Sequence, residues 1–95
     1  MREIKYRRNS FREIVERIKD IISNEIDGKV YDRHVADVLK ISNSTLRIYK
    51  IKNIVPLENI AYFCEKFNIS FDWLVYDKSF KIRKLREDVY KNKHF

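Results

Sequence analysis

The sequence predicts an all-α domain of five helices, and three observations lead to this fold class. Apolar residues recur every three to four positions over long stretches, which is the spacing of one helix face. The chain contains 1 Gly and 1 Pro, too few for the tight turns that join the strands of a sheet. With 95 residues and 44% hydrophobic residues, it is long enough to bury one core and too short for two.

The first helix is expected to run from Phe11 to about Asn24. Ser10 and Glu13 have the spacing of a capping box, in which each side chain satisfies the other residue's backbone N–H. Behind them, one helix face is apolar: Phe11, Ile14, Val15, Ile18 and Ile22. The Asp27–Gly28 pair predicts a turn after this helix.

Two short helices should follow, separated by the break at residues 40–42. Asp32 is the expected N-cap of the first, and Ser42 that of the second. The inward residues of the pair are predicted to be Val35, Ala36, Leu39, Leu46 and Tyr49.

The fourth and fifth helices occupy the stretch after residue 55. Pro56 suits the first turn of the fourth helix, and Ser70 is the expected N-cap of a short helix at 71–75. The predicted core stripe of the fourth helix is Leu57, Ile60, Ala61, Cys64 and Phe67. Residues 79–95 form a basic tail with weak helical spacing.

Two short helices joined by a three- or four-residue turn are typical of a helix-turn-helix. Ala36 is small, which allows the second helix to cross close over the first, and Ile41 is expected to fill the corner between them. No Asp or Glu occurs between Asp37 and Glu58. A carboxylate on this surface would repel DNA, so its absence favours a helix that enters the major groove.

The excess of positive charge lies mainly at the two ends of the chain. Residues 1–12 carry five cations and one anion, and residues 78–95 carry seven cations and two anions. The part between them is slightly acidic. This distribution predicts a protein that binds a polyanion with a basic N-terminal arm (1–9) and a basic tail (79–95) on either side of the helical domain (10–78), although an A/T-biased genome would also enrich Lys.

The outward residues of the second short helix are the candidates for base contacts: Asn43, Ser44, Arg47 and Ile48. Arg47 can pair with guanine through two hydrogen bonds, Asn43 can read adenine, and Ile48 suits a thymine methyl group. For each there is an alternative: a solvated cation for Arg47, ordinary first-turn residues for Asn43 and Ser44, and burial in the core for Ile48.

Other polar residues are candidates for contacts to the phosphate backbone. Such contacts supply affinity without reading the sequence, and the candidates are Thr45, Lys50, Lys52, Asn53 and Arg33. Arg7 and Arg8 form either a minor-groove arm or a solvated terminus.

The stretches "ISNSTLRIYK", "VPLENIAYFCEKFNIS" and "FDWLV" resemble the helix-turn-helix domain of the phage CI repressor family, over about residues 10–78. The resemblance implies a five-helix lambda-repressor-like bundle that binds an operator as a homodimer and represses transcription. Lys40 stands where the family has a left-handed Gly, and Tyr76–Asp77 replaces its Thr-Gly ending. The family often continues into a second domain, whereas this chain ends at Phe95.

The sequence lacks the features of several other classes of protein. There is no Gly-rich phosphate loop and no nucleophile–His or paired-carboxylate pattern, so no enzyme and no cofactor are predicted. His34 and His94 have no partners at metal-ligand spacing. One Cys, no apolar run of ~20 residues and no signal peptide predict a cytoplasmic protein without a membrane span.

Two other functions remain open at this point. One is a protein-interaction module that binds an antirepressor or another protein partner through the tail and the Trp73 end. The other is an antitoxin that represses its own operon. A salt-dependent affinity for duplex DNA distinguishes a DNA-binding protein from a pure interaction module.

Overall fold

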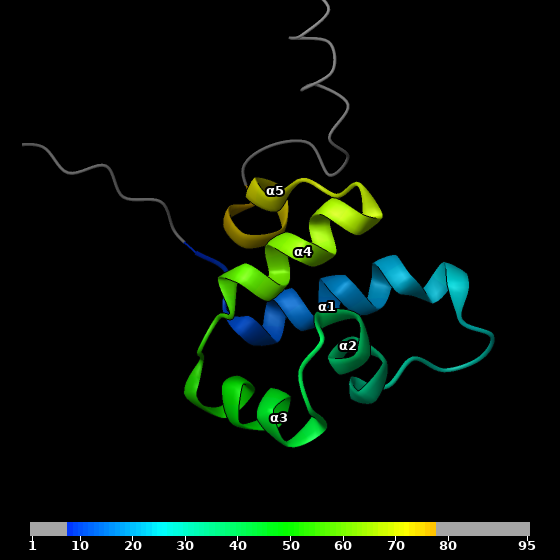
Figure 1. Ribbon diagram of the computed structural model, residues 1–95, viewed down its shortest axis with the longest axis horizontal. Helices are drawn as coiled ribbons and strands as arrows, with labels where there is room; N and C mark the ends of the chain where they lie inside the picture. Colours follow the sequence, from blue (N-terminus) through cyan, green and yellow to red (C-terminus); the bar gives the residue numbers. More distant parts are fainter. Residues whose placement is uncertain (1–7, 78–95) are drawn as a thin grey trace, which may run out of the picture.

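The computed structural model describes residues 8–77, and within that range the chain is all-helical, with no strand. The elements in chain order are α1 (Phe11–Ile22), the 3-10 turn η1 (Ser23–Glu25), α2 (Asp32–Leu39), α3 (Asn43–Lys52), α4 (Leu57–Phe67) and α5 (Phe71–Tyr76) (Figure 1). The predicted all-α class is therefore confirmed. The predictions for residues 1–7 and for the tail at 78–95 fall outside the described residues.

Three serines begin helices, as predicted. The hydroxyl groups of Ser10, Ser42 and Ser70 accept hydrogen bonds from the third backbone N–H of α1, α3 and α5 respectively. At α1 the capping box is complete, because Glu13 Oε1 accepts from the Ser10 backbone N–H at 2.9 Å. These caps place the start of α3 at residue 43, the position on which the candidate site depends.

Two predicted helix starts are wrong by one residue. The N-cap of α2 is Tyr31, not Asp32; its backbone N–H donates to His34 Nδ1 at 2.9 Å. Asp32 is the first helical residue, and its carboxylate pairs with two lysines instead of the backbone. Pro56 is the N-cap of α4 and not part of its first turn. At α2 the cap contact is local, between Tyr31 and His34, while the Asp32 carboxylate is engaged by lysines of other helices.

Four helices end at a residue in the left-handed conformation. Lys40, Asn53, Asn68 and Asp77 have φ between 55° and 62°. Asn and Asp tolerate this region, but a Lys there is strained because its Cβ approaches the backbone. Lys40 thus takes the conformation that the family resemblance assigned to a Gly. The backbone N–H groups of Lys40 and Ile41 donate to Asp37 O and Ala36 O and so cap the C-terminal end of α2.

We expect Lys40→Gly to stabilise the fold by roughly 1 kcal/mol, because Gly has no Cβ to strain the left-handed turn. The Lys40 side chain is exposed, so the change does not empty a core position. Lys40→Ala is the matched control, since it shortens the side chain but keeps Cβ, and should give no such gain. Chemical denaturation of the three proteins measures this, and equal free energies of unfolding for Gly and Ala would contradict the strain.

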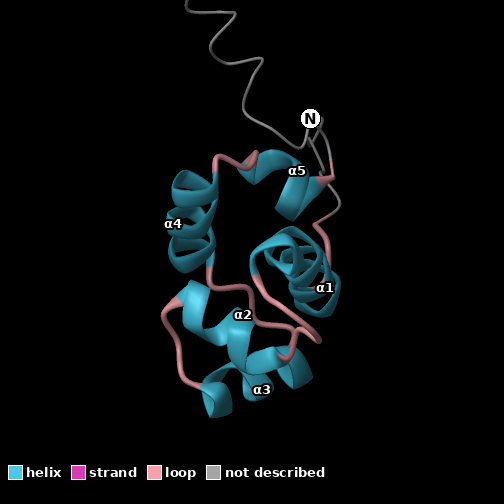
Figure 2. Ribbon diagram, turned by 90° about the vertical axis from the view of Figure 1, so that its right-hand side faces the viewer, coloured by secondary structure: helices cyan, strands magenta, loops and turns pink. Residues whose placement is uncertain are grey.

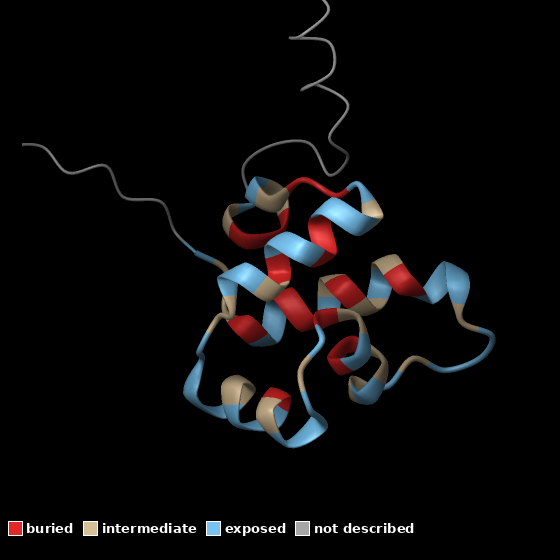
Figure 3. Ribbon diagram, viewed as in Figure 1, coloured by how far each residue is buried: buried red, intermediate tan, exposed pale blue. Residues whose placement is uncertain are grey.

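The core lies between α1, α2, α4 and α5, with one residue from α3 (Figure 3). Its buried hydrophobic residues are Phe11, Ile14, Val15, Ile18, Ile22, Val35, Ala36, Leu39, Leu46, Ile60, Phe63, Cys64, Ile69, Leu74 and Val75. The predicted inner faces of the first three helices are confirmed, with Tyr49 half-buried against the core.

The predicted core stripe of α4 is partly wrong. Leu57 and Ala61 are exposed, whereas Phe63, which the prediction left out, is fully buried and stacks on Phe67 with ring centroids 4.6 Å apart. Ile60 and Cys64 are buried as predicted and Phe67 is half-buried, and with Phe63 they form a face at helical spacing. The observed face is thus the predicted one turned toward Phe63 and away from Leu57 and Ala61.

Helix α3 lies at one end of the bundle, away from α5 (Figures 1 and 2). It contacts α2 and α1. This position leaves one long side of α3 toward solvent, which is the prerequisite for the candidate interface.

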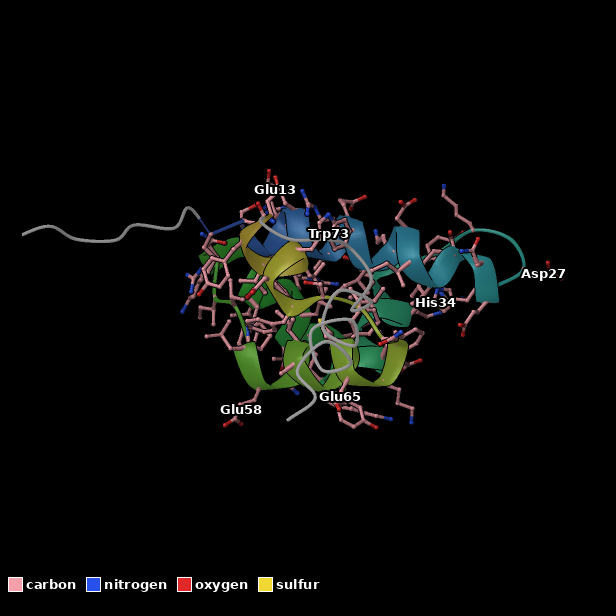
Figure 4. The ribbon with its side chains drawn as sticks, turned by 90° about the horizontal axis from the view of Figure 1, so that it is seen from above. Glu13, Asp27, His34, Glu58, Glu65 and Trp73 are labelled. Carbon is pink, nitrogen blue, oxygen red and sulfur yellow. The ribbon has the colours of Figure 1, made fainter. Side chains whose placement is uncertain are left out.

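The opposite end of the bundle is held by Asn9 and Arg17. Asn9 donates to Val75 O at 2.7 Å and, through Nδ2, to Leu74 O at 3.0 Å. Arg17 donates to Trp73 O at 2.9 Å and to Asp77 Oδ1 at 3.0 Å, and its guanidinium lies 4.6 Å from the centroid of the Trp73 ring. Trp73 therefore lies between α5 and α1 (Figure 4). The carbonyl end of α5 is satisfied by the side chains of Asn9 and Arg17 and by the backbone N–H groups of Asn9 and Asp77.

Candidate nucleic-acid interface

Helix α3 is divided into an outer and an inner side. Asn43, Ser44, Arg47 and Ile48, the four candidates for base contacts, are all exposed. Ile48 is 48% exposed, so its alternative role as a core residue is excluded. On the inner side, Leu46 is 1% exposed and anchors the helix on the core. The structure thus brings the four candidates together on one accessible face, which we call the α3 outer face.

The N-terminus of α3 is organised by one hydroxyl group. Ser42 Oγ accepts from the Thr45 N–H at 3.0 Å, donates to Thr45 Oγ1 at 2.8 Å and lies 3.3 Å from Ser44 Oγ. Thr45, a predicted phosphate contact, is therefore half-buried within the cap. The positive end of the α3 helix dipole lies at this N-terminus and favours the binding of an anion such as phosphate there.

The surface around α3 carries three exposed cations. Lys40, Arg47 and Lys52 are exposed, and the sequence from residue 38 to 57 has no Asp or Glu. Labelled acidic side chains of the loop and of α4, Asp27 and Glu58, point outward at opposite ends of the molecule (Figure 4). The outer face can therefore approach a polyanion without a repelling carboxylate of its own helix.

Lys50, predicted to contact phosphate, is engaged by another residue. Its Nζ lies 2.8 Å from Asp32 Oδ2, and the Lys50 side chain is 18% exposed. The other oxygen of Asp32, Oδ1, lies 2.8 Å from Lys19 Nζ on α1. This arrangement could not be predicted from the sequence, because the three residues come from three helices and are 13 to 31 positions apart.

These contacts shift two pKa values. Partial burial alone would raise the pKa of the Asp32 carboxyl, but the hydrogen bonds and charges of Lys19 and Lys50 together outweigh it and lower that pKa below 3.8. The hydrogen bond to Asp32 raises the pKa of Lys19 above 10.5, against the opposing effect of burial. Glu16, 3.6 Å from Lys19 Nζ, acts in the same direction.

We expect these ion pairs to make stability depend on pH in acid. Because the pKa of Asp32 is lower in the folded state, the unfolded chain binds the proton more readily, and this contribution to stability is present above pH 3.8 and lost as the pH falls through the folded value. Thermal melts from pH 7 to pH 2.5 should show a smaller acid loss in Asp32→Asn than in the parent. Asp20→Asn, which removes an exposed carboxylate of α1, is the control, and identical acid profiles for the two variants would contradict the prediction.

Asn53 has a structural contact in addition to its predicted role at phosphate. It ends α3 in the left-handed conformation, and its Oδ1 accepts from the Phe11 backbone N–H at 2.8 Å. This bond joins the end of α3 to the start of α1. The side-chain oxygen is used here and the Asn53 backbone N–H donates to Tyr49 O, so a contact from Asn53 to phosphate would come from its side-chain amide nitrogen.

Arg33 and its neighbours form a second basic group at the start of α2. The Arg33 guanidinium lies 5.0 Å from the centroid of the Tyr31 ring, and Lys29 Nζ lies 5.9 Å from the same centroid. Tyr31 is 46% exposed. Of the proposed arm, Arg8 is exposed, and Arg7 lies outside the described residues.

Sequence reasoning missed an apolar surface next to the outer face. Ile51 is 68% exposed, Ile54 42% and Leu57 41%, at the end of α3, in the following loop and at the start of α4. Leu57 was predicted to lie in the core, and the sequence analysis assigned no role to Ile51 or Ile54, although their spacing of three residues is visible in the sequence. A run of large apolar side chains on the surface is a feature of interaction sites.

Within residues 8–77, no group of three or more His, Cys, Asp and Glu side chains is placed to hold a metal ion. No helix in that range has the length and apolar character that crossing a bilayer requires. Comparison with protein-family models, with curated proteins and with solved structures gives no match to this chain.

Proposed function

We propose that this chain is a sequence-specific DNA-binding transcriptional regulator, in which α2, the turn at Lys40 and α3 form a helix-turn-helix of the phage CI repressor type. The observation that carries the proposal is the α3 outer face: a capped helix N-terminus that exposes Asn43, Ser44 and Arg47, with no carboxylate on the helix. A helix of this composition at one end of a bundle fits the major groove of B-DNA, which is about 12 Å wide.

The residues have distinct roles in this proposal. Arg47 pairs with guanine O6 and N7, Asn43 with adenine, and Ile48 contacts a thymine methyl group. Ser44 contacts a base or a phosphate at the positive end of the helix. The exposed Lys52 and Arg33 flank this row and contact phosphate, and the protein performs no chemical step on its ligand.

Repression follows from occupancy of the operator. A homodimer would place two copies of α3 in successive major grooves about 34 Å apart, on a site with two-fold symmetry. RNA polymerase cannot use a promoter that this dimer covers.

Selection of bound sequences from a random DNA pool tests the proposal most directly. An enriched inverted repeat with half-sites about one helical turn apart supports it, and a pool that remains random after repeated rounds would overturn it. Fluorescence anisotropy with the selected duplex then measures the salt dependence of the affinity.

Lys52→Ala and Lys66→Ala form a matched pair of variants for this measurement. Loss of one phosphate contact should lower the salt slope by about one unit on every duplex. Lys66→Ala, which removes an exposed lysine of α4, should leave the slope unchanged. Equal slopes for both variants would remove Lys52 from the interface.

The exposed apolar surface of Ile51, Ile54 and Leu57 favours a second candidate, a protein-interaction module. Such a protein needs no affinity for DNA. Duplex binding that is absent at low salt, where phosphate contacts are strongest, would favour this candidate over the first.

A further inference from the structure

One carboxylate joins α1, α2 and α3 at the inner edge of α3. Asp32, at the start of α2, accepts from Lys19 of α1 through Oδ1 and from Lys50 of α3 through Oδ2, each at 2.8 Å. The exposed fractions of the side chains are 23% for Lys19, 39% for Asp32 and 18% for Lys50. We call these three residues the Asp32 cluster.

The cluster lies at the border of the α3 outer face. Lys50 is one helical turn after Arg47 and two turns after Asn43, so the three residues follow one side of the helix. Arg47 and Asn43 are exposed, whereas the Lys50 ammonium is turned toward the bundle by Asp32. Lys52, two residues later, has no such partner among the described residues and is exposed.

The electrostatics of the cluster resist a change of partner. If Lys50 left Asp32 for a phosphate, the half-buried carboxylate would keep one cation in place of two, while it approached the negative duplex. Two ammonium groups on one carboxylate are also close to each other, and Asp32 screens their mutual repulsion. Asp32 therefore both fixes α3 on α1 and α2 and occupies the ammonium of Lys50.

We propose that Asp32 is a positioning residue that withdraws Lys50 from phosphate binding and thereby limits sequence-independent affinity for DNA. The proposal rests on the proposed function, and it replaces the sequence-based expectation that Lys50 itself contacts phosphate. The bases are read by Arg47 and its neighbours, whereas an additional mobile cation beside them would strengthen binding to every duplex alike.

Anisotropy with a random duplex tests the proposal in four proteins besides the parent. Asp32→Asn frees Lys50, so its plot of log affinity against log salt should steepen by about 0.9, which is about 3.5-fold more affinity lost between 50 and 200 mM salt. Asp20→Asn has the same change of net charge at an exposed position and should match the parent. Lys50→Gln should also match the parent, and Asp32→Asn with Lys50→Gln should return to the parent slope.

A second measurement requires no DNA. Acetylation of the free protein, read by mass spectrometry, should modify Lys50 more slowly than Lys52 in the parent, and Asp32→Asn should bring the two rates together. Lys66 serves as the internal reference. This measurement reports the ion pair directly, whether or not the protein binds a duplex.

The outcomes separate the two proposals. A parent protein without salt-dependent duplex binding overturns the proposed function, and the inference falls with it even if acetylation reports the pair. Where the parent binds, equal slopes for Asp32→Asn and Asp20→Asn overturn the inference alone. A slope that decreases in Lys50→Gln has the same result, because Lys50 would then contact phosphate; this variant keeps Asp32 paired with Lys19 and decides the question even if Asp32→Asn does not fold.

Discussion

Leu46→Ala is expected to destabilise the protein by about 2–5 kcal/mol, the range for a fully buried Leu in a well-packed core. Leu46 is 1% exposed and is the one residue of α3, a helix that is described in full, that lies inside the core. Domains of this size are stable by roughly 5–15 kcal/mol. The melting temperature, followed by circular dichroism, should fall by roughly 10 °C or more.

The matched control for Leu46→Ala is Ile51→Ala in the same helix. Leu and Ile lose the same number of carbon atoms on replacement by Ala, but Ile51 is 68% exposed. Its replacement should change the free energy of unfolding by no more than about 0.5 kcal/mol. Similar losses for the two variants would show that α3 is not held on the bundle by Leu46.

Arg47→Ala is expected to weaken binding to the selected operator by about 1–3 kcal/mol and to relax the preference at one base position. The physical reason is that a guanidinium forms two hydrogen bonds with one guanine, which no other base offers in the same geometry. The measurement is the affinity of parent and variant for the operator and for duplexes with each single substitution.

Arg47→Lys separates charge from base recognition. Lys keeps the cation but loses the planar pair of donors, so the salt slope should stay near that of the parent while the base preference weakens. A uniform loss on operator and random duplex in Arg47→Ala would assign Arg47 to phosphate contact and remove it from the base-reading set.

The secondary structure was predictable where the signal is local. Ser10, Ser42 and Ser70 have short hydroxyl side chains immediately before periodic apolar segments, and each of them caps the predicted helix. The left-handed conformation after α2 was implied by the resemblance, which places a Gly there, and not by Lys40 itself, because a residue with a Cβ disfavours that region.

The remaining features depend on contacts between distant segments. Phe63 and Leu57 are both apolar, and only the packing of α4 on the bundle decides that the first is buried and the second exposed. Likewise, Lys50 and Lys52 have the same side chain two positions apart, yet one is held by Asp32 and the other is exposed. Spacing within a helix defines a face, but the partners of that face come from other helices.

The Trp73 indole, which lies under the Arg17 guanidinium, is an intrinsic fluorophore at a well-defined place in the molecule. The chain has 1 Trp, so its emission comes from the end of the bundle where α5 meets α1. Separation of α5 from α1 would expose the indole to water and shift its emission to longer wavelengths. Because α3 lies at the other end, a titration with nucleic acid should leave the spectrum unchanged while unfolding alters it, and a single cuvette can distinguish the two events.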